Sequence, residues 1–183
     1  MNTFNNSADV KTSSGPLFLY IPISRLVTMS IISSGLYDAY WIYKNWRYIK
    51  ERDNIDILPF WRGIFGVLFC HSLLRRIYND KEARSVLIPS FSPGLLATGW
   101  VILTLFARIM TRFASSSTTI IIASLVPTFL FLAPVQEYIN TVTKMTNPSQ
   151  AYYGWTLGQL LCLVFGVINW TILLLSLAGE LFM

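Results

Sequence analysis

Residues 157–178 read LGQLLCLVFGVINWTILLLSLA, a run that contains no Asp, Glu, Lys or Arg. An α-helix rises about 1.5 Å per residue, so about 20 apolar residues cross the hydrocarbon core of a bilayer. The run therefore predicts a membrane-spanning helix over 156–180. It sets the expected fold class, an all-α membrane protein.

Two further segments have the length and composition of spanning helices. We expect one over 94–112, with Arg108 near its end, and one over 117–137. Pro127 and Pro134 should kink or end the second, because proline removes a helical hydrogen bond. The connection between the two is short, which favours a helical hairpin.

Overall composition agrees with this class. The chain has 183 residues, of which 54% are hydrophobic and 13% charged, whereas soluble domains carry roughly a quarter charged residues. A soluble fold would expose large apolar patches, which soluble monomers avoid. Nine of the 14 Lys and Arg lie between Lys44 and Arg84, interleaved with aromatic residues. This mixture favours anionic lipid head groups as partners and argues against nucleic acid.

The first half of the chain contains shorter apolar runs. They predict re-entrant or interfacial helices over 23–32, 36–52 and 59–78, with a break near 33–35. A ten-residue helix is about 15 Å long, half a bilayer, so it can enter and return only if protein shields its broken backbone. One continuous tilted span from Leu19 to Tyr43 is the alternative.

Domain organisation and orientation follow from the same patterns. We expect a disordered polar tail over 1–16 and a single helical membrane domain over 17–183, with an aromatic and basic half (17–84) and a transmembrane half (90–180). Because cytoplasmic loops of membrane proteins are enriched in Lys and Arg, the stretch from Lys44 to Arg84 is expected to face the cytoplasm.

The densest motif is Gly35-Leu-Tyr-Asp-Ala-Tyr-Trp-Ile-Tyr-Lys-Asn-Trp-Arg47. Its aromatic residues cannot share one helix face, although some recur at i, i+3, i+4 and i+7. One interpretation is an aromatic belt whose basic side chains reach toward water. The other is a binding site for a lipid head group or a partner, built from Tyr37, Tyr40, Trp41, Lys44, Asn45, Arg47 and, further along, Arg62.

This motif and a second one, Pro59-Phe-Trp-Arg-Gly-Ile-Phe65, resemble an uncharacterised family of small bacterial integral membrane proteins. Gln136, Asn140 and the terminal span are similar to the second half of that family. The resemblance covers roughly Ile21 to Gly179. It implies a bacterial inner-membrane location and no particular activity.

Arg62 falls in the first turn of its predicted helix, where the macrodipole opposes a cation. A lipid phosphate, Asp53 or Asp56, or stacking on Trp61 would each offset this repulsion. An arginine that simply extends into water is the alternative.

Polar residues inside apolar segments form a second group of candidates, because ionisable groups at membrane depth are often functional. Asp38 is the expected partner of Arg25, across the break near Gly35. His71 is interpreted as a packing histidine beside Cys70. Buried polar or ionisable candidates are thus Arg25, Asp38, His71, Gln136, Asn140 and Asn169.

Small residues recur every four positions at Gly154, Gly158, Cys162 and Gly166. Such a stripe lets helices approach closely, within the chain or between copies. Cys70 and Cys162 are expected to be buried thiols, since they lack CxxC spacing.

No hydrolase, nucleotide-binding or metalloprotease motif is present, and no metal or cofactor is predicted. The leading hypothesis is a non-enzymatic membrane protein that binds lipid, a protein partner or another copy of itself. One alternative is an oligomeric channel or transporter subunit in which Gln136, Asn140 and Asn169 line water. Another is an enzyme that modifies lipid head groups with His71, Asp38 or Tyr40.

Overall fold

The structure, a computed structural model, describes residues 16–148 and 154–182. Within these ranges every regular element is a helix, which confirms the predicted all-α fold. The predicted tail lies almost wholly outside them. Along the chain the helices are α1 (Ile23–Ile32), α2 (Leu36–Asp53), α3 (Pro59–Ile64), α4 (Gly66–Tyr78), α5 (Lys81–Val86), α6 (Pro93–Arg112), α7 (Ser117–Ser124), α8 (Phe129–Thr146) and α9 (Leu157–Leu181).

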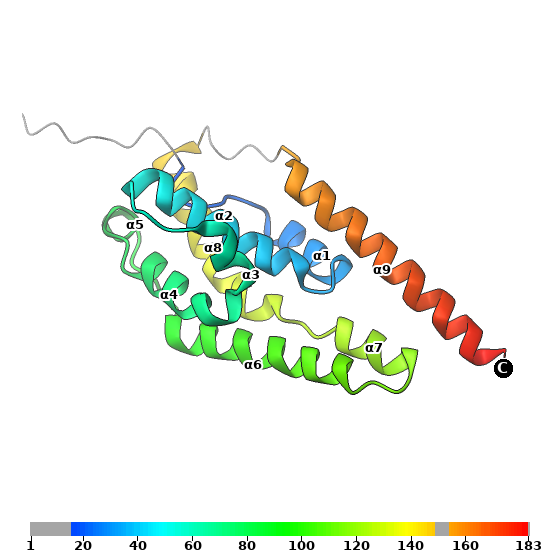
Figure 1. The fold of residues 1–183 in the computed structure, drawn as a ribbon. Coiled ribbons are helices and arrows are strands. Elements are labelled where there is room, and N and C mark those ends of the chain that lie inside the picture. The colour runs from blue at the N-terminus through cyan, green and yellow to red at the C-terminus, as the bar shows by residue number, and fades with distance from the viewer. Residues whose placement is uncertain (1–15, 149–153, 183) are drawn as a thin grey trace, which may run out of the picture.

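Three helical segments are long and apolar enough to cross a membrane: Pro93–Arg112, Ser117–Thr146 and Leu157–Leu181. The protein is therefore a multi-pass membrane protein. In Figure 1, α6 and α9 run in the same general direction, and the α7–α8 segment returns between them. The predicted spans over 94–112 and 156–180 are confirmed at both ends to within one residue.

The second span differs from the expectation in two ways. It is interrupted over residues 125–128, where Pro127 cannot donate a backbone hydrogen bond, and Pro134 stays inside α8. The predicted end at residue 137 is wrong, because α8 continues to Thr146. The extra turns are retained because their apolar face, with Ile139 and Val142, packs into the core.

Helices α1 and α2 form a hairpin, in place of one continuous helix over 19–43. Its turn has Ser34 and Gly35 at positive φ, a conformation that glycine adopts without strain. The indole of Trp170 donates to Ile32 O at 3.0 Å, and the amide of Asn169 donates to Ser34 Oγ at 3.1 Å. Trp170 and Asn169 lie at the middle of α9, so the turn of the hairpin lies beside the midpoint of that candidate span. Such a position is expected for a re-entrant hairpin.

A second hairpin consists of α3 and α4. The predicted single helix over 59–78 is broken at Phe65. A Cβ on Gly63 would lie 2.6 Å from the Tyr43 Cβ, and one on Gly66 would lie 2.8 Å from Ile42 Cδ1. Only glycine therefore lets both arms approach α2 this closely, and the break lets the chain turn back beside it.

An extended segment, residues 17–21, is buried before α1 begins. Buried backbone groups outside helices need partners. Asn45 Oδ1 accepts from Leu19 N at 3.1 Å, Gln136 Nε2 donates to Leu19 O at 2.9 Å, and Asn140 Nδ2 donates to Ile21 O at 2.7 Å. We call these three side chains the amide clamp. The clamp ties the start of the α1–α2 hairpin to α8.

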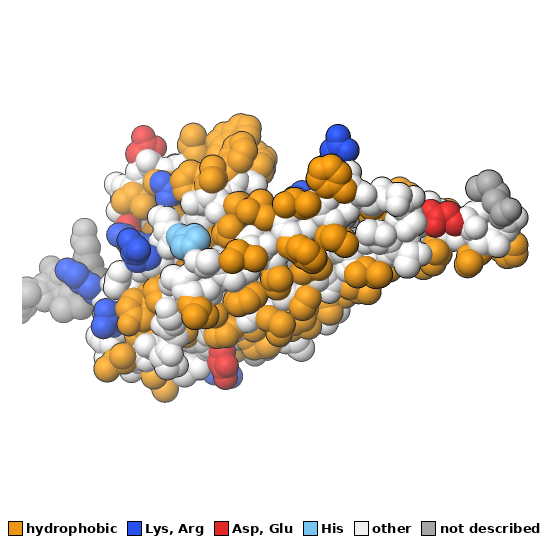
Figure 2. Space-filling model, turned by 90° about the horizontal axis from the view of Figure 1, so that it is seen from below, with side chains coloured by type: hydrophobic (Ala, Val, Ile, Leu, Met, Phe, Trp, Pro, Cys, Tyr) orange, Lys and Arg blue, Asp and Glu red, His pale blue; other side chains and the backbone are white. Residues whose placement is uncertain are grey.

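The molecular surface reflects the membrane environment. Figure 2 shows a face on which hydrophobic side chains spread widely, while Lys and Arg gather mostly toward one end. That end holds α5 and the carboxyl ends of α2 and α4 (Figure 1).

Candidate functional site: an aromatic and basic surface and a buried carboxyl

The residues of the aromatic motif separate into a buried and an accessible group. Tyr37, Trp41 and Asn45 are fully buried. Asn45 belongs to the amide clamp, and Trp41 Nε1 donates to Gln136 Oε1 at 2.5 Å. These three side chains lie inside the fold and hold α2 in place, so they do not form an accessible surface.

Lys44 and Arg47 form the accessible group on α2, whereas Tyr40 is partly buried and its hydroxyl lies 2.8 Å from Thr156 Oγ1. The Lys44 ammonium lies 5.5 Å from the Tyr48 ring centroid, and Arg47 pairs with Glu51 at 2.7 Å on the exposed surface. Burial, and then the neighbouring Arg47, lower the pKa of Lys44. Cations repel one another on this side of α2, so an anion beside them would be stabilised.

Arg62 is held by aromatic rings. Its guanidinium lies 4.3 Å from the Trp46 ring centroid and 5.0 Å from that of Phe69. Of the alternatives considered for Arg62, cation–π stacking is thus observed, but on Trp46 and Phe69, while the Trp61 ring stacks on Phe65. No ion pair involves Arg62 in the described ranges, so its charge is balanced by ring faces and not by a carboxylate.

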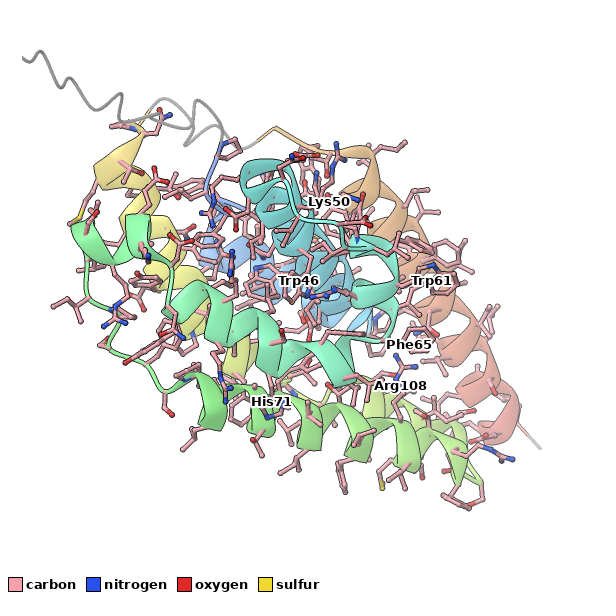
Figure 3. All side chains as sticks on the ribbon, turned by 60° about the vertical axis from the view of Figure 1, so that its left-hand side comes forward. Trp46, Lys50, Trp61, Phe65, His71 and Arg108 are labelled. Atoms are coloured by element: carbon pink, nitrogen blue, oxygen red, sulfur yellow. The ribbon has the colours of Figure 1, made fainter. Side chains whose placement is uncertain are left out.

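Beside Arg62, the α3–α4 hairpin exposes a row of large apolar side chains. Phe60 is 59% exposed, Trp61 51% and Phe65 49%. Figure 3 shows Trp61 and Phe65 at the outer side of the hairpin, whereas Trp46 lies among the helices. The full row, here called the apolar ridge, comprises Leu58, Phe60, Trp61, Ile64, Phe65 and Leu68.

Asp38 is the acid that the fold buries most completely, at 1% exposed. Ser30 Oγ donates a hydrogen bond to its Oδ1. Its Oδ2 accepts from Trp100 Nε1 at 3.0 Å and from Thr128 Oγ1 at 2.6 Å. The expected pairing with Arg25 is wrong, since these donors occupy the carboxyl and the Arg25 guanidinium lies 4.6 Å from the Trp155 ring centroid.

Two opposing terms act on the Asp38 charge. Burying an ionised carboxylate without a cation costs several kcal/mol even after relaxation. Each hydrogen bond to a charged group contributes about 1.5–3 kcal/mol in the other direction. Three such bonds are comparable with the burial cost, so both protonation states are compatible with this site.

His71 and Asn169 were expected among the buried polar residues, and both are exposed on the protein surface. His71 lies on the outer side of α4, where its Nε2 is 3.0 Å from Thr98 Oγ1 on α6. Cys70, its neighbour in sequence, is fully buried. Adjacent helical residues point about 100° apart, and the pair therefore does not form a nucleophile and base.

The predicted small-residue stripe lies against the first hairpin. A Cβ on Gly158 would lie 2.3 Å from the Tyr40 ring, and one on Gly166 2.3 Å from Ile32 O. Cys162 is buried between them, whereas Gly154 is exposed and precedes α9. The stripe thus packs α9 onto α1 and α2 of the same chain.

An ion-pair cluster near the carboxyl ends of α2 and α4 was missed at the level of sequence. Arg52 contacts Asp53 at 2.8 Å and Asp80 at 2.6 Å, and Arg76 contacts Asp53 at 2.6 Å. The hydrogen bond from Arg52 is the main reason that the pKa of Asp53 is lowered. The density of charge around residues 50–84 could have suggested a cluster, but not its pairings.

Within residues 16–148 and 154–182, no three His, Cys, Asp or Glu side chains come close enough to hold a metal ion. No protein-family model, curated protein or solved structure matches the chain. The fold itself defines the class, an α-helical multi-pass membrane protein with two hairpins packed against its spans. Within that class, the exposed aromatic and basic surface and the buried Asp38 are the two candidate sites.

Proposed function

We propose that this protein binds anionic phospholipid through the apolar ridge and three cations of α2 and α3, Lys44, Arg47 and Arg62. We further propose a bacterial inner membrane as its location, with the region around Lys44 to Arg84 facing the cytoplasm. The protein would then act as a lipid-binding or scaffolding component of that membrane and not as an enzyme.

The observation that carries the proposal is the position of Arg62 beside the ridge. Its guanidinium stacks on Trp46 and Phe69 and has no carboxylate partner in the described part of the chain. Phe60 and Trp61 directly precede Arg62 in sequence and expose about half of their surface. Aromatic side chains favour the membrane interface, and a bidentate guanidinium suits a phosphate.

Other candidate functions have less support. Gln136 and Asn140 bind the buried segment over 17–21, and Asn169 binds Ser34. These polar groups therefore stabilise contacts within the chain. This argues against the hypothesis of a pore that they line. His71 bonds to Thr98 and points away from Cys70. The hypothesis of an enzyme that modifies lipid head groups therefore lacks an assembled nucleophile and base.

The test compares two triple variants that remove the same charge. Lys44→Gln, Arg47→Gln and Arg62→Gln are combined in one protein. The control combines Arg75→Gln, Lys81→Gln and Lys144→Gln, which are exposed cations outside the proposed site. Each is purified with its own lipids and measured by native mass spectrometry, with far-UV circular dichroism to check folding.

We expect the site variant to retain at least about tenfold less phosphatidylglycerol, since each nearby cation contributes about 1 kcal/mol. The control should retain as much as the unchanged protein. Equal retention by the two variants would contradict the proposal, because the effect would then be one of net charge alone.

A further inference from the structure

We propose that Asp38 is a proton-binding site, and that its protonation controls the packing of the α1–α2 hairpin against α6 and against the α7–α8 segment. This inference is independent of the proposed lipid surface. It rests on a buried carboxyl that links discontinuous elements of the fold and has no cation beside it.

Asp38 connects four parts of the chain. It belongs to α2, and its hydrogen-bond donors are Ser30 on α1, Trp100 on α6 and Thr128 in the break between α7 and α8. No salt bridge in residues 16–148 and 154–182 includes it. One carboxyl therefore joins the first hairpin to two of the three spans.

The surroundings of Asp38 suit a proton better than a metal cation. An indole N–H can only donate, so Trp100 directs the positive end of its N–H bond at Oδ2. A cation at that position would be repelled by this bond. A proton on Oδ1 can instead be donated to Ser30 Oγ, while Oδ2 still accepts from Trp100 and Thr128. Every contact of the carboxyl is thus kept in its neutral form.

Among the described residues, no ion pair offsets the ionised form of Asp38. The groups that face Asp38 are the Ser30 hydroxyl from α1, the Cys70 thiol from α4, the Trp100 indole from α6 and the Thr128 hydroxyl from the break. His71, the other titratable group on that part of α4, is exposed and bonded to Thr98. When Asp38 releases its proton to water, a full negative charge therefore stays buried among neutral groups.

The elements that Asp38 joins lie next to two interruptions of regular helix. The turn over 33–35 and the break over 125–128 interrupt the helical hydrogen-bond ladder. Such segments open locally at lower cost than continuous helix. Ionisation favours hydration of the carboxylate, and separation of the hairpin from α6 and the break would allow water to reach it.

The experiment uses the full chain in vesicles of phosphatidylethanolamine and phosphatidylglycerol. Infrared difference spectra between acid and alkaline pH record the C=O band of a protonated carboxyl. Hydrogen exchange over residues 29–38, corrected for its intrinsic pH dependence, records the packing of the hairpin. Asp38→Asn is compared with Asp56→Asn, a matched change at an exposed acid.

We expect one titrating C=O band to be lost in Asp38→Asn and kept in Asp56→Asn. Exchange over 29–38 should accelerate at alkaline pH in the unchanged protein and in Asp56→Asn, but not in Asp38→Asn. Spectra and exchange profiles that are the same for both variants would overturn the proposal.

Thr128→Val provides a second test that does not depend on the stability of Asp38→Asn. It removes one donor to the carboxylate and keeps the shape of the side chain. The titration midpoint of the C=O band should therefore rise by about one pH unit. An unchanged midpoint would show that the titrating group is not the carboxyl bonded to Thr128, and would overturn the proposal.

Discussion

The α1–α2 hairpin and the α9 span lie side by side but are held in the fold by different forces. The hairpin buries Ser30, Asp38 and Asn45. Ser30 donates to Asp38 within the hairpin, whereas Asp38 and Asn45 also bond to other parts of the chain. In α9, only 17% of the most apolar window is buried, and its mean hydropathy is 2.4. Lipid can thus stabilise α9 directly, whereas the hairpin depends on protein contacts that satisfy its polar groups.

This comparison predicts that the loss of a polar side chain is most destabilising where that side chain bonds to the hairpin or to the segment before it. Gln136→Leu should cost about 3 kcal/mol or more, because Trp41 Nε1 and Leu19 O both lose a buried partner at about 1–3 kcal/mol each. Thermal unfolding in detergent measures the loss, and hydrogen exchange over 17–21 locates it.

The control for that change is Glu137→Leu, at the next position of α8, where the side chain is exposed. Its free energy of unfolding should lie within about 0.5 kcal/mol of that of the unchanged protein. A similar loss for the two variants would mean that the amide clamp does not distinguish the hairpin from the spans.

The contact between the two regions provides the next test. Gly166→Ala places a Cβ 2.3 Å from Ile32 O, which is backbone and cannot rotate away, so we expect a loss of about 2 kcal/mol from overpacking. Gly179→Ala in the same helix meets no atom within 4 Å and should be neutral or slightly stabilising. Thermal unfolding of both variants measures the difference, and equal stability would place the hairpin elsewhere along α9.

The smallest expected effect lies at the carboxyl end of α2, in the ion-pair cluster of Arg52, Asp53, Arg76 and Asp80. The hydrogen bond from Arg52, followed by that from Arg76, lowers the pKa of Asp53 in the folded protein. The contribution of Asp53 to stability is therefore complete above its pKa in the unfolded chain, about 3.9. It is lost as pH falls through the lower pKa of the folded protein.

Asp53→Asn should remove this acid-dependent loss, which we expect to be about 1 kcal/mol or less. Unfolding midpoints measured between neutral and acidic pH provide the check, with Asp56→Asn as the exposed control. If Asp53→Asn and the unchanged protein lose stability in parallel below pH 4, the cluster contributes nothing in solution.

The spans could be predicted from sequence because lipid surrounds them, so that apolar composition and length are enough to identify them. The ends of α6 and α9 and the turn near Ser33 to Gly35 followed from charge, apolar length and a glycine. The continuation of α8 to Thr146 did not, because it depends on which helices cover Ile139 and Val142.

The candidate site was harder to predict. The motif over 35–47 marked the right helix, but it could not separate buried Trp41 and Asn45 from accessible Lys44 and Arg47. Asp38 was singled out, yet its partners lie 8, 62 and 90 residues away in sequence. Arg25 was expected because it is opposite in charge, but the fold brings neutral donors to the carboxyl instead.

The central claim is that α1 and α2 enter the membrane and return to the same side, while α6, the α7–α8 segment and α9 cross it. Single cysteines at Pro16, Asn54 and Ser115, in a background with Cys70→Ala and Cys162→Ala, can be labelled with a membrane-impermeant thiol reagent from each side of the membrane. We predict that positions 16 and 54 are labelled from one side and position 115 from the other. Labelling of positions 16 and 54 from opposite sides would mean that the first hairpin crosses the bilayer, and would contradict the account.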